Sequence, residues 1–406
     1  MPDPIIFHID VNSAFLSWSA LSLLQEGSDT DIRQIPAIVG GDITKRHGVV
    51  LAKSIPAKAY GITTGEPVVN AYRKCPTLVS VPPDHAMYSR RSRELMEHLA
   101  AICPEIEQVS IDECYMNFTP IAGEYPSPVA AATIIKDEIL KRFGFSVNVG
   151  ISDRKVLAKM ASDFEKPNKV HTLFSHEISQ KLWPLPVSSL FLCGRSSVDT
   201  LHKLGILTIG DLAQSNPGIL ESHLKSHGTV LWNYANGRDD SQVVPEPAQA
   251  KGIGNSTTVS KDIEDYEEAC RVLLQLAESV GRRLRKQHFC AGLVCTEIKY
   301  NDFRSVSHQG ILLTPSASTD VIYRKACELF KELWNGTPIR LLGIRTTKLT
   351  EDTEPVQLNL FDYSQSKSEK QQRLDQALDR IRLRYGQDAI TRGSLLDTSF
   401  EEDESE

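Results

Sequence analysis

One short apolar segment with two adjacent acidic residues in its middle constrains this chain more than any other feature. It runs from Val109 to Phe118, and Asp112 and Glu113 interrupt its β-favouring residues. Unpaired carboxylates are costly to bury, so such groups usually have cations or hydrogen-bond donors as partners. A second strand-like segment, residues 5–11, carries Asp10 near its end. If the two strands pair, three carboxylates meet at one edge of a sheet.

These three acids have the chemistry of a site for a hard divalent cation. Magnesium takes oxygen ligands, commonly one or two carboxylates together with substrate phosphates. We therefore expect Asp10, Asp112 and Glu113 to form a metal-assisted phosphoryl-transfer site. Successive side chains on a regular strand face opposite ways, so the chain must bend near Asp112, for instance at a hairpin turn. The residues alone leave open a second interpretation, an exposed turn with one structural acid.

Length and composition place the chain among multidomain globular proteins. Its 406 residues exceed one ordinary core and predict two to four domains. No apolar run approaches the roughly 20 residues of a membrane span, and the N-terminus lacks the regions of a signal peptide, so we expect a cytoplasmic protein without a membrane partner. The eight cysteines form no CxxC pair and no zinc-like cluster, which favours reduced thiols.

The net charge of −7 is concentrated at the C-terminal end. Residues 351–406 contain 14 acidic and 7 basic residues, so the first 350 residues are neutral. Basic clusters such as residues 282–286 are therefore free to meet phosphate. Residues 367–385 predict an amphipathic helix, and the last acidic residues are expected to be disordered. The apolar face of that helix comprises Leu374, Leu378, Ile381 and Tyr385.

A strand-to-helix corner is predicted directly after Asp10. Asn12 or Ser13 could cap a helix from about residue 14 to 24, and free backbone N–H groups at such a corner suit a phosphate. Phe15 lies about one turn into that helix and, by residue type, is most simply a core residue. Residues 36–75 predict a small α+β subdomain of short strands and glycine turns. Any lysine of this subdomain that faces the Asp10 corner could hold a triphosphate.

The next segments alternate between helices and a strand. Amphipathic helices are predicted over residues 84–102 and 127–143, and an alternating strand over residues 145–152. A further helix covers residues 154–163. Proline and asparagine stop it, which leaves Lys166 at the stop.

Three motifs in this order resemble the Y-family DNA polymerases, in their bacterial DNA polymerase IV (DinB) branch. The motifs are residues 9–12, residues 110–115 and residues 149–168, the last with its Leu-Ala-Lys and Lys-Pro-Asn runs. The resemblance covers residues 4 to about 361 and implies an α+β multidomain fold, the right-hand polymerase. It implies a palm over 1–18 and 76–170, fingers over 19–75, a thumb with a helix-hairpin-helix over 171–236, a linker over 237–250, a βαββαβ little finger over 251–350, and a clamp-binding peptide and tail over 351–406.

The resemblance also implies roles for residues around the three acids. They match ligands of two Mg²⁺ ions, with the Val11 carbonyl as a further ligand, and the ions bridge an incoming dNTP and the primer 3′-oxygen. Phe15 matches the steric gate that excludes the 2′-hydroxyl of a ribonucleotide, and Lys166 matches a residue that grips the triphosphate. The chain departs from the family where a tyrosine and an arginine contact the triphosphate. Ile55 and Lys58 stand there, and a lysine offers a point charge instead of a planar fork.

Two regions are expected to hold primer–template DNA through its phosphates. The turn at Gly194 and Arg195 feeds a helix N-terminus and resembles the family's helix-hairpin-helix. Leu192 stands where the family usually has glycine, so ordinary helix packing remains an alternative. Residues 251–349 predict strand, helix, strand, strand, helix, strand, and resemble the little finger at residues 254–258 and around Arg304. Phosphate contacts from this domain would hold a duplex without reading its sequence.

A short apolar peptide follows the last predicted domain. An extended peptide with leucine and an aromatic residue suits a hydrophobic groove. It resembles the sliding-clamp-binding peptide of bacterial polymerases, so a sliding clamp is an expected partner. Its residues are Gln357, Leu358, Asn359, Leu360 and Phe361.

The combined prediction is a translesion-type DNA polymerase that adds dNTPs to a primer 3′-hydroxyl. We expect low fidelity, because no segment is left over for a proofreading nuclease, and a monomeric protein. A non-catalytic DNA-binding or clamp-binding protein on a polymerase scaffold is the first alternative, and the three intact carboxylates argue against it. A nucleotide cyclase or another metal-dependent nucleotidyl transferase is the second, and the DNA-binding regions and the clamp peptide argue against it.

Overall fold

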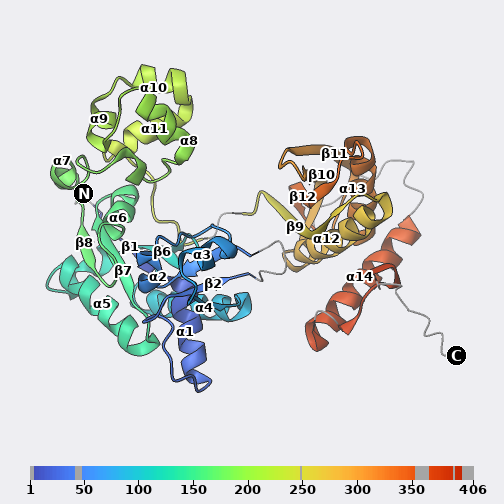
Figure 1. Ribbon diagram of the computed structural model, residues 1–406, viewed down its shortest axis with the longest axis horizontal. Helices are drawn as coiled ribbons and strands as arrows, with labels where there is room; N and C mark the ends of the chain where they lie inside the picture. Colours follow the sequence, from blue (N-terminus) through green and yellow to red (C-terminus); the bar gives the residue numbers. More distant parts are fainter. Residues whose placement is uncertain (1–3, 42–47, 247–248, 353–364, 387–388, 396–406) are drawn as a thin grey trace. The chain divides into compact units, whose positions relative to one another are not determined.

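The computed structural model describes residues 4–41, 48–246, 249–352, 365–386 and 389–395 (Figure 1). Contacts divide the chain into two compact units, residues 1–247 and 248–406. Each unit combines sheets and helices, which confirms the predicted α+β multidomain fold. Among the described residues, no helix is both long and apolar enough to cross a membrane.

A five-stranded sheet forms the centre of the first unit. Its strand order is β5 (Ile106–Gln108), β6 (Glu113–Asn117), β1 (Ile6–Val11), β7 (Val147–Ser152) and β8 (Val170–Thr172). Strand β1 pairs antiparallel with both β6 and β7, and every one of its residues is buried. Phe7, Ile9 and Val11 alternate with His8 and Asp10, so the apolar side chains occupy one face and the polar ones the other.

Helices cover this sheet and share its core. They are α1 (Ala14–Gln25), α4 (His85–Ile102), α5 (Pro128–Phe143) and α6 (Lys155–Ser162), and a 3₁₀ helix, η1 (Thr119–Glu124), follows β6. Apolar residues of β1, β6 and β7 pack with those of α1, α4 and α5 in one buried cluster. Helix α6 approaches β7 closely at Gly150, where an added Cβ atom would lie 2.0 Å from the carbonyl oxygen of Ala158. The helix that carries the Leu-Ala-Lys run therefore lies directly on the sheet.

A smaller sheet and a group of short helices complete the first unit. The sheet has the order β3 (Val50–Lys53), β2 (Ala37–Gly40), β4 (Val79–Val81), and α2 (Ile55–Ala59) and α3 (Val68–Lys74) accompany it. The helices after β8 pack around a second apolar core, to which α6 also contributes residues. They are η2 (Ser175–Glu177), α7 (Ile178–Lys181), η3 (Val187–Ser189), α8 (Arg195–Lys203), α9 (Ile209–Gln214), α10 (Pro217–Leu224) and α11 (Ser226–Ala235).

The segment after α11 follows the surface of the first unit. The Asp239 carboxylate accepts a hydrogen bond from the Val156 backbone N–H at 3.0 Å. The Val244 N–H donates to Glu107 at 2.8 Å, and Lys155 donates to the Gln242 carbonyl at 3.2 Å. The first part of the predicted linker is thus bound to this unit, although its sequence has no helical or strand periodicity.

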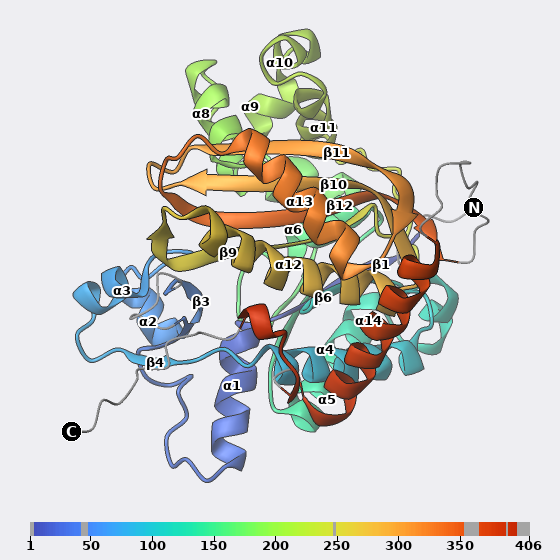
Figure 2. The same cartoon turned by 90° about the vertical axis from the view of Figure 1, so that its right-hand side faces the viewer.

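The second unit contains the predicted strand, helix, strand, strand, helix, strand order. Its antiparallel sheet has the order β11 (Ser305–Ser316), β10 (Phe289–Tyr300), β12 (Ile339–Glu351), β9 (Gly252–Ile263). Helices α12 (Tyr266–Lys286) and α13 (Thr319–Leu333) lie side by side on one face of this sheet (Figure 2). Their apolar sides and that face of the sheet form the core of the unit.

A further helix, α14 (Gln365–Tyr385), binds to the second unit through charged side chains, and η5 (Gly393–Leu395) follows it. Asp375 and Arg382 are its buried residues, whereas Leu374 and Tyr385 are 47% and 67% exposed. Two residues of the predicted apolar face are therefore exposed and the other two, Leu378 and Ile381, are partly buried, whereas the buried side chains of this helix are charged.

Ion pairs between α14 and α12 explain this polar contact. Glu278 accepts hydrogen bonds from Arg382 at 3.1 Å and from Arg392 at 2.8 Å. Arg285 donates to Asp379 at 2.6 Å. Arg285 belongs to the basic cluster that we expected to meet phosphate, but its guanidinium is committed to this network.

One member of the network also caps a helix of the domain. The Asp375 carboxylate accepts a hydrogen bond from the Thr319 backbone N–H at 3.0 Å. Ser318, the residue before α13, makes no capping hydrogen bond with its own side chain. A residue of α14 thus satisfies a free N–H group at the start of α13.

Candidate active site at one end of the central sheet

The pairing of β1 with β6 brings the predicted acids together. Asp10 lies directly opposite Glu113 in the antiparallel register. Strand β6 begins only at Glu113, because residues 109–112 form the turn of the β5–β6 hairpin, and the Val11 N–H donates to the Asp112 carbonyl at 3.0 Å. The strand that we expected to begin at Val109 therefore begins later, at Glu113. Residues 109–112 form a turn instead, and this turn supplies the bend that two adjacent acids require.

The Asp112 carboxyl group is partly buried and lies near two other carboxylates. Burial raises the pKa of its carboxyl, and the neighbouring Asp10 and Glu113 carboxylates raise it further. A hydrogen bond of 2.6 Å from the Ser110 hydroxyl acts in the opposite direction without cancelling the effect. Burial is the larger cause of this rise in pKa, and repulsion from the two neighbouring carboxylates adds to it.

Glu113 is held by two basic side chains from other elements. The Lys159 ammonium lies 2.7 Å from its carboxylate, and the His8 ring nitrogen Nε2 lies 3.4 Å away. The contact with His8, together with Lys159, outweighs burial and lowers the pKa of Glu113 to about 2. His8 itself is buried, which lowers its pKa, and its Nδ1 atom is 2.8 Å from the Ser162 hydroxyl.

Asp10 has Lys166 as its ionic partner. Lys166 forms a short ion pair with Asp10 and a second one, of 2.8 Å, with Asp163. Burial alone would lower the pKa of Lys166, but the Asp10 and Asp163 carboxylates together outweigh burial and the pKa is raised. The lysine predicted at the end of the α6 segment thus reaches the Asp10 corner.

The carboxylate and carbonyl oxygens at this site are of the type that binds a hard cation, but the side chains are not arranged around one point as metal ligands would be. Within the described ranges, no three carboxylate, histidine or cysteine side chains converge closely enough to hold a metal ion. Two of the three carboxylates instead contact lysines, Asp10 with Lys166 and Glu113 with Lys159. Carboxylate and carbonyl oxygens are nevertheless the ligands that Mg²⁺ prefers, and a cation would relieve the repulsion at Asp112.

Phe15 lies near this corner, but the local capping differs from the prediction. Its ring stacks on Tyr88 with a centroid distance of 4.5 Å. Ser13 precedes α1 in a left-handed conformation and makes no capping hydrogen bond. The Asn12 side chain donates to Asn148 at 3.1 Å instead of capping the helix. The predicted capping by Asn12 or Ser13 is therefore wrong, because Asn12 is used to join β1 to β7.

The residues at the position of the family's triphosphate contacts lie on α2. Ile55 is 61% exposed, and Lys58 is exposed as well. No contact in the described part of the chain joins Lys58 to the three carboxylates. Burial lowers the pKa of Lys53, which ends β3, and the positive charge of Lys58 lowers it further.

The proposed DNA-contacting residues lie at exposed turns. Gly194 precedes α8 and leaves its first N–H groups without a side-chain cap. Leu192 has φ 65°, a left-handed conformation that suits glycine and strains leucine. In the β10–β11 hairpin, the Arg304 guanidinium lies 5.1 Å from the centre of the Tyr300 ring. Gln357, Leu358, Leu360 and Phe361, the proposed clamp contacts, lie outside the described residues.

Sequence reasoning did not assign roles to His8 and Lys159. A usable signal existed for His8, because residues two apart on a strand share a face and His8 therefore lies on the same side as Asp10. Lys159 belongs to the Leu-Ala-Lys run, but its contact with Glu113 depends on how α6 crosses the sheet. That crossing follows from the close approach at Gly150.

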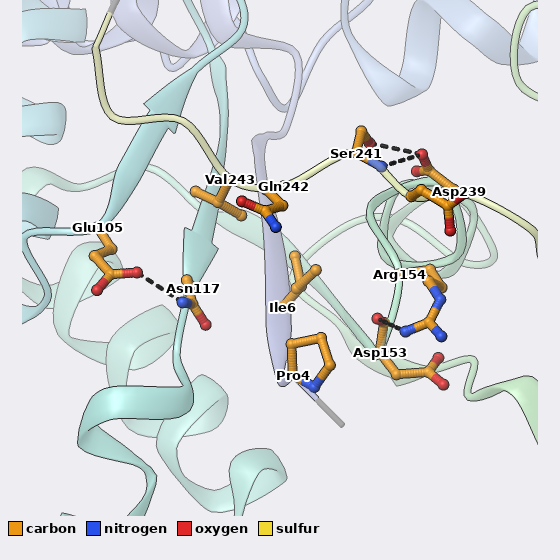
Figure 3. A pocket seen from close by; sticks show the side chains of 11 residues that line it. Pro4, Ile6, Glu105, Asn117, Asp153, Arg154, Asp239, Ser241, Gln242 and Val243 are labelled. Carbon is orange, nitrogen blue, oxygen red and sulfur yellow. Dashed lines mark hydrogen bonds between the residues drawn. The ribbon is translucent and has the colours of Figure 1, made fainter. Parts of the chain in front are cut away.

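A separate cavity of about 480 Å³ lies near the start of β1, at the end of the strand away from Asp10 (Figure 3). Ile6, Asn117 and the segment 239–243 line it. Its polar groups are engaged with one another, since Asn117 donates to Glu105 at 2.6 Å and Arg154 donates to the Asp153 carbonyl at 2.8 Å. The cavity does not belong to the cluster of carboxylates.

Comparisons with known proteins decide the family. The impB/mucB/samB family profile matches residues 9–163, and the profile of the C-terminal domain of that family matches residues 250–360. A protein named DNA polymerase IV from Clostridium acetobutylicum is 44% identical, with 97% of this chain and 98% of that protein aligned. DNA polymerase IV 1 of Bacillus subtilis is 35% identical, over 97% of this chain and 93% of that protein. This chain belongs to the DNA polymerase IV branch of the Y family.

A solved structure agrees with this assignment at the level of the fold. A Y-family DNA polymerase chimera, Dbh-Dpo4(243-245)-Dbh, matches with a TM-score of 0.73 and 22% identity, over 86% of this chain and 99% of the other. As a member of the Y family, the protein is a DNA-directed DNA polymerase of the translesion type, with metal-dependent nucleotidyl transfer as its chemistry. A non-catalytic DNA-binding scaffold is not favoured.

Proposed function

We propose that this Y-family polymerase extends a DNA primer at the carboxylates where β1 meets β6. The pairing of Asp10 with Glu113, next to Asp112 in the hairpin turn, is the observation that carries the proposal. Asp10, Asp112, Glu113 and the Val11 carbonyl would hold two Mg²⁺ ions. Such ions neutralise charge on the reacting phosphate and lower the pKa of the attacking 3′-hydroxyl.

The chain's own side chains would position the incoming dNTP. Lys166, which contacts Asp10, lies where the triphosphate of a nucleotide beside Asp10 would require a cation. Lys58 and Lys53 supply further positive charge from the small sheet and α2. The stacked ring of Phe15 would occupy the space of a ribose 2′-hydroxyl and so exclude ribonucleotides. With selection left to these contacts, we expect low fidelity without proofreading.

Two groups of residues would hold the primer–template through its phosphates. The uncapped start of α8 at Gly194 and Arg195 offers backbone N–H groups and a guanidinium to one phosphate. Arg304, in the β10–β11 hairpin, would bind another. In this proposal the palm comprises residues 1–18 and 76–170, the fingers 19–75, the thumb 171–236, and the little finger 251–350 after the linker 237–250.

The proposal extends to a sliding clamp as partner and to a monomeric enzyme in the cytoplasm. The peptide Gln357–Phe361, which lies within the clamp-binding peptide and tail of residues 351–406, would bind the hydrophobic groove of the clamp. Deletion of residues 357–361 is expected to reduce primer extension only when a clamp is present. An equal loss without the clamp would assign the peptide to the fold.

Primer extension by an Asp112→Asn variant tests the catalytic part of the proposal. The substitution keeps the shape of the side chain but removes its charge, so we expect extension to fall by more than about a hundredfold. Affinity for primer–template DNA, measured by fluorescence anisotropy, is expected to stay within about twofold. The matched control is Glu124→Gln, which alters an exposed acid at the end of η1. Full activity in Asp112→Asn, or loss of DNA binding, would contradict the assignment.

A further inference from the structure

Two cysteines face each other between α12 and α13, outside the proposed active site. The sulfur atoms of Cys270 and Cys327 are 3.5 Å apart, although 57 positions separate these residues in the sequence. Both residues are partly exposed. All eight cysteines lie in the described part of the chain, and no other two have their sulfur atoms in contact there. The packing of the two helices therefore creates a dithiol that sequence spacing does not reveal.

The surroundings of this pair favour a thiolate on Cys270. Its pKa is lowered to about 7, because the Cys327 thiol donates a hydrogen bond to it and the Tyr266 hydroxyl adds another, against the effect of burial. The pKa of Cys327 is raised, first because its proton is held in the bond to Cys270. Burial raises the pKa of Cys290, the other partly exposed cysteine of this unit. The Cys270 thiol is thus suited to attack a disulfide first, and the Cys327 thiol is suited to react in a second step.

We propose that Cys270 and Cys327 form a reversible thiol–disulfide site whose reactant is a low-molecular-weight disulfide. The Cys270 thiolate attacks one sulfur of that disulfide, and the other half leaves as a thiol after taking up a proton. Cys327 then loses its proton to solvent and attacks the Cys270 sulfur of the mixed disulfide, which releases the second half as a thiol. The protein loses two electrons, and the small disulfide gains them as two thiols.

The geometry makes the second step an intramolecular one. A disulfide has a bond length of about 2.05 Å, so the two sulfur atoms need to approach by roughly 1.5 Å from their present contact. Rotation of two cysteine side chains on neighbouring helices supplies movements of this size. The resolving thiol is in contact with the attacking one, so the mixed disulfide is expected to be short-lived.

Peptide mapping of the full-length protein after incubation with glutathione disulfide at pH 7 tests the proposal. The expected product is a single intramolecular disulfide between Cys270 and Cys327, without a stable glutathione adduct. Cys327→Ser removes the resolving thiol and is expected to accumulate the glutathione adduct on Cys270. Cys290→Ser is the matched control and is expected to leave formation of the disulfide unchanged.

Alkylation of the unmodified protein provides a second measurement that does not depend on the folding of a variant. Near pH 7, iodoacetamide is expected to modify Cys270 roughly tenfold faster than Cys290, because the larger thiolate fraction of Cys270 outweighs the lower intrinsic nucleophilicity of a thiolate with a low pKa. Equal rates at the two residues would overturn the proposal. The proposal would also be overturned if glutathione disulfide modified Cys290 of the Cys327→Ser protein and left Cys270 without an adduct.

Discussion

Replacement of Gly150 by alanine should disrupt the contact that places the lysines of α6 beside the carboxylates. The added Cβ atom would lie 2.0 Å from the Ala158 carbonyl oxygen and 2.5 Å from the Ser162 backbone nitrogen. Ordinary contact begins near 3.4 Å, so helix and strand must separate by roughly 1.4 Å. Both atoms belong to the backbone, so a change of side-chain rotamer cannot relieve the clash.

The free-energy cost combines this separation with the hydrogen bonds that it strains. Overpacking in a core costs about 1–3 kcal/mol, and a contact between backbone atoms belongs at the upper end. Ser162 accepts a hydrogen bond from Asn148 at 2.9 Å through its carbonyl, and its hydroxyl contacts His8 at 2.8 Å. Each such bond contributes about 1 kcal/mol. We therefore expect Gly150→Ala to lower the free energy of unfolding of the first unit by about 3–5 kcal/mol.

Urea unfolding followed by tryptophan fluorescence measures this loss. Three of the four tryptophans, Trp18, Trp183 and Trp232, lie in the first unit and dominate the signal. The control is Gly123→Ala, where an added Cβ would meet no atom within 4 Å, and its effect should stay within about 0.5 kcal/mol. If Gly150→Ala unfolds at the same urea concentration as the control, the close approach of α6 to β7 does not exist in solution, and the placement of Lys159 and Lys166 fails with it.

Three further substitutions test other parts of the structure. Phe15→Ala is expected to raise ribonucleotide incorporation in primer-extension assays with mixed nucleotides, and an unchanged ratio would remove its role as steric gate. Leu192→Gly relieves a left-handed leucine and is expected to stabilise the first unit by up to about 1 kcal/mol in urea unfolding, whereas a loss of stability would mean that the leucine side chain contributes more by packing. Asp375→Ala leaves the Thr319 backbone N–H group without its acceptor and removes the buried carboxylate that contacts Arg392 and Arg285, so unfolding of the second unit should become easier by about 3 kcal/mol, compared with less than about 0.5 for the exposed Glu328→Gln. An equally small effect for Asp375→Ala would show that α14 is not part of the folded domain.

Features set by local pattern could be predicted from the sequence. The apolar, β-favouring residues 5–11 predicted a strand with Asp10 near its end, and the structure places that strand at the centre of the sheet. The order of strands and helices in the second unit was also predicted from the sequence. Two adjacent acids in one segment required a bend, and the hairpin turn before Glu113 supplies it.

Features that depend on distant partners could not be predicted. Nothing local in His8 or Lys159 shows that both reach Glu113, since the contact depends on three elements meeting at one sheet end. The pattern of α14 predicted an amphipathic helix with an apolar face, but its buried side chains are Asp375 and Arg382 because Glu278 and Arg285 lie opposite them on α12. Complementary charges 90 or more positions apart have no periodicity that a single sequence displays.

The two lysines beside the carboxylates show how one helix end balances the charge of the site. Lys166 contacts Asp10 and Lys159 contacts Glu113, which leaves Asp112 as the carboxylate without a lysine and the one whose pKa is raised. Asp163 lies 2.8 Å from Lys166 and 3.7 Å from Lys159, so both ammonium groups have a second, half-exposed partner. In the proposed reaction, Lys166 would leave Asp10 for a triphosphate and keep the contact with Asp163. The transfer would expose Asp10 at the moment when a nucleotide arrives, which is when the proposed reaction requires its oxygens.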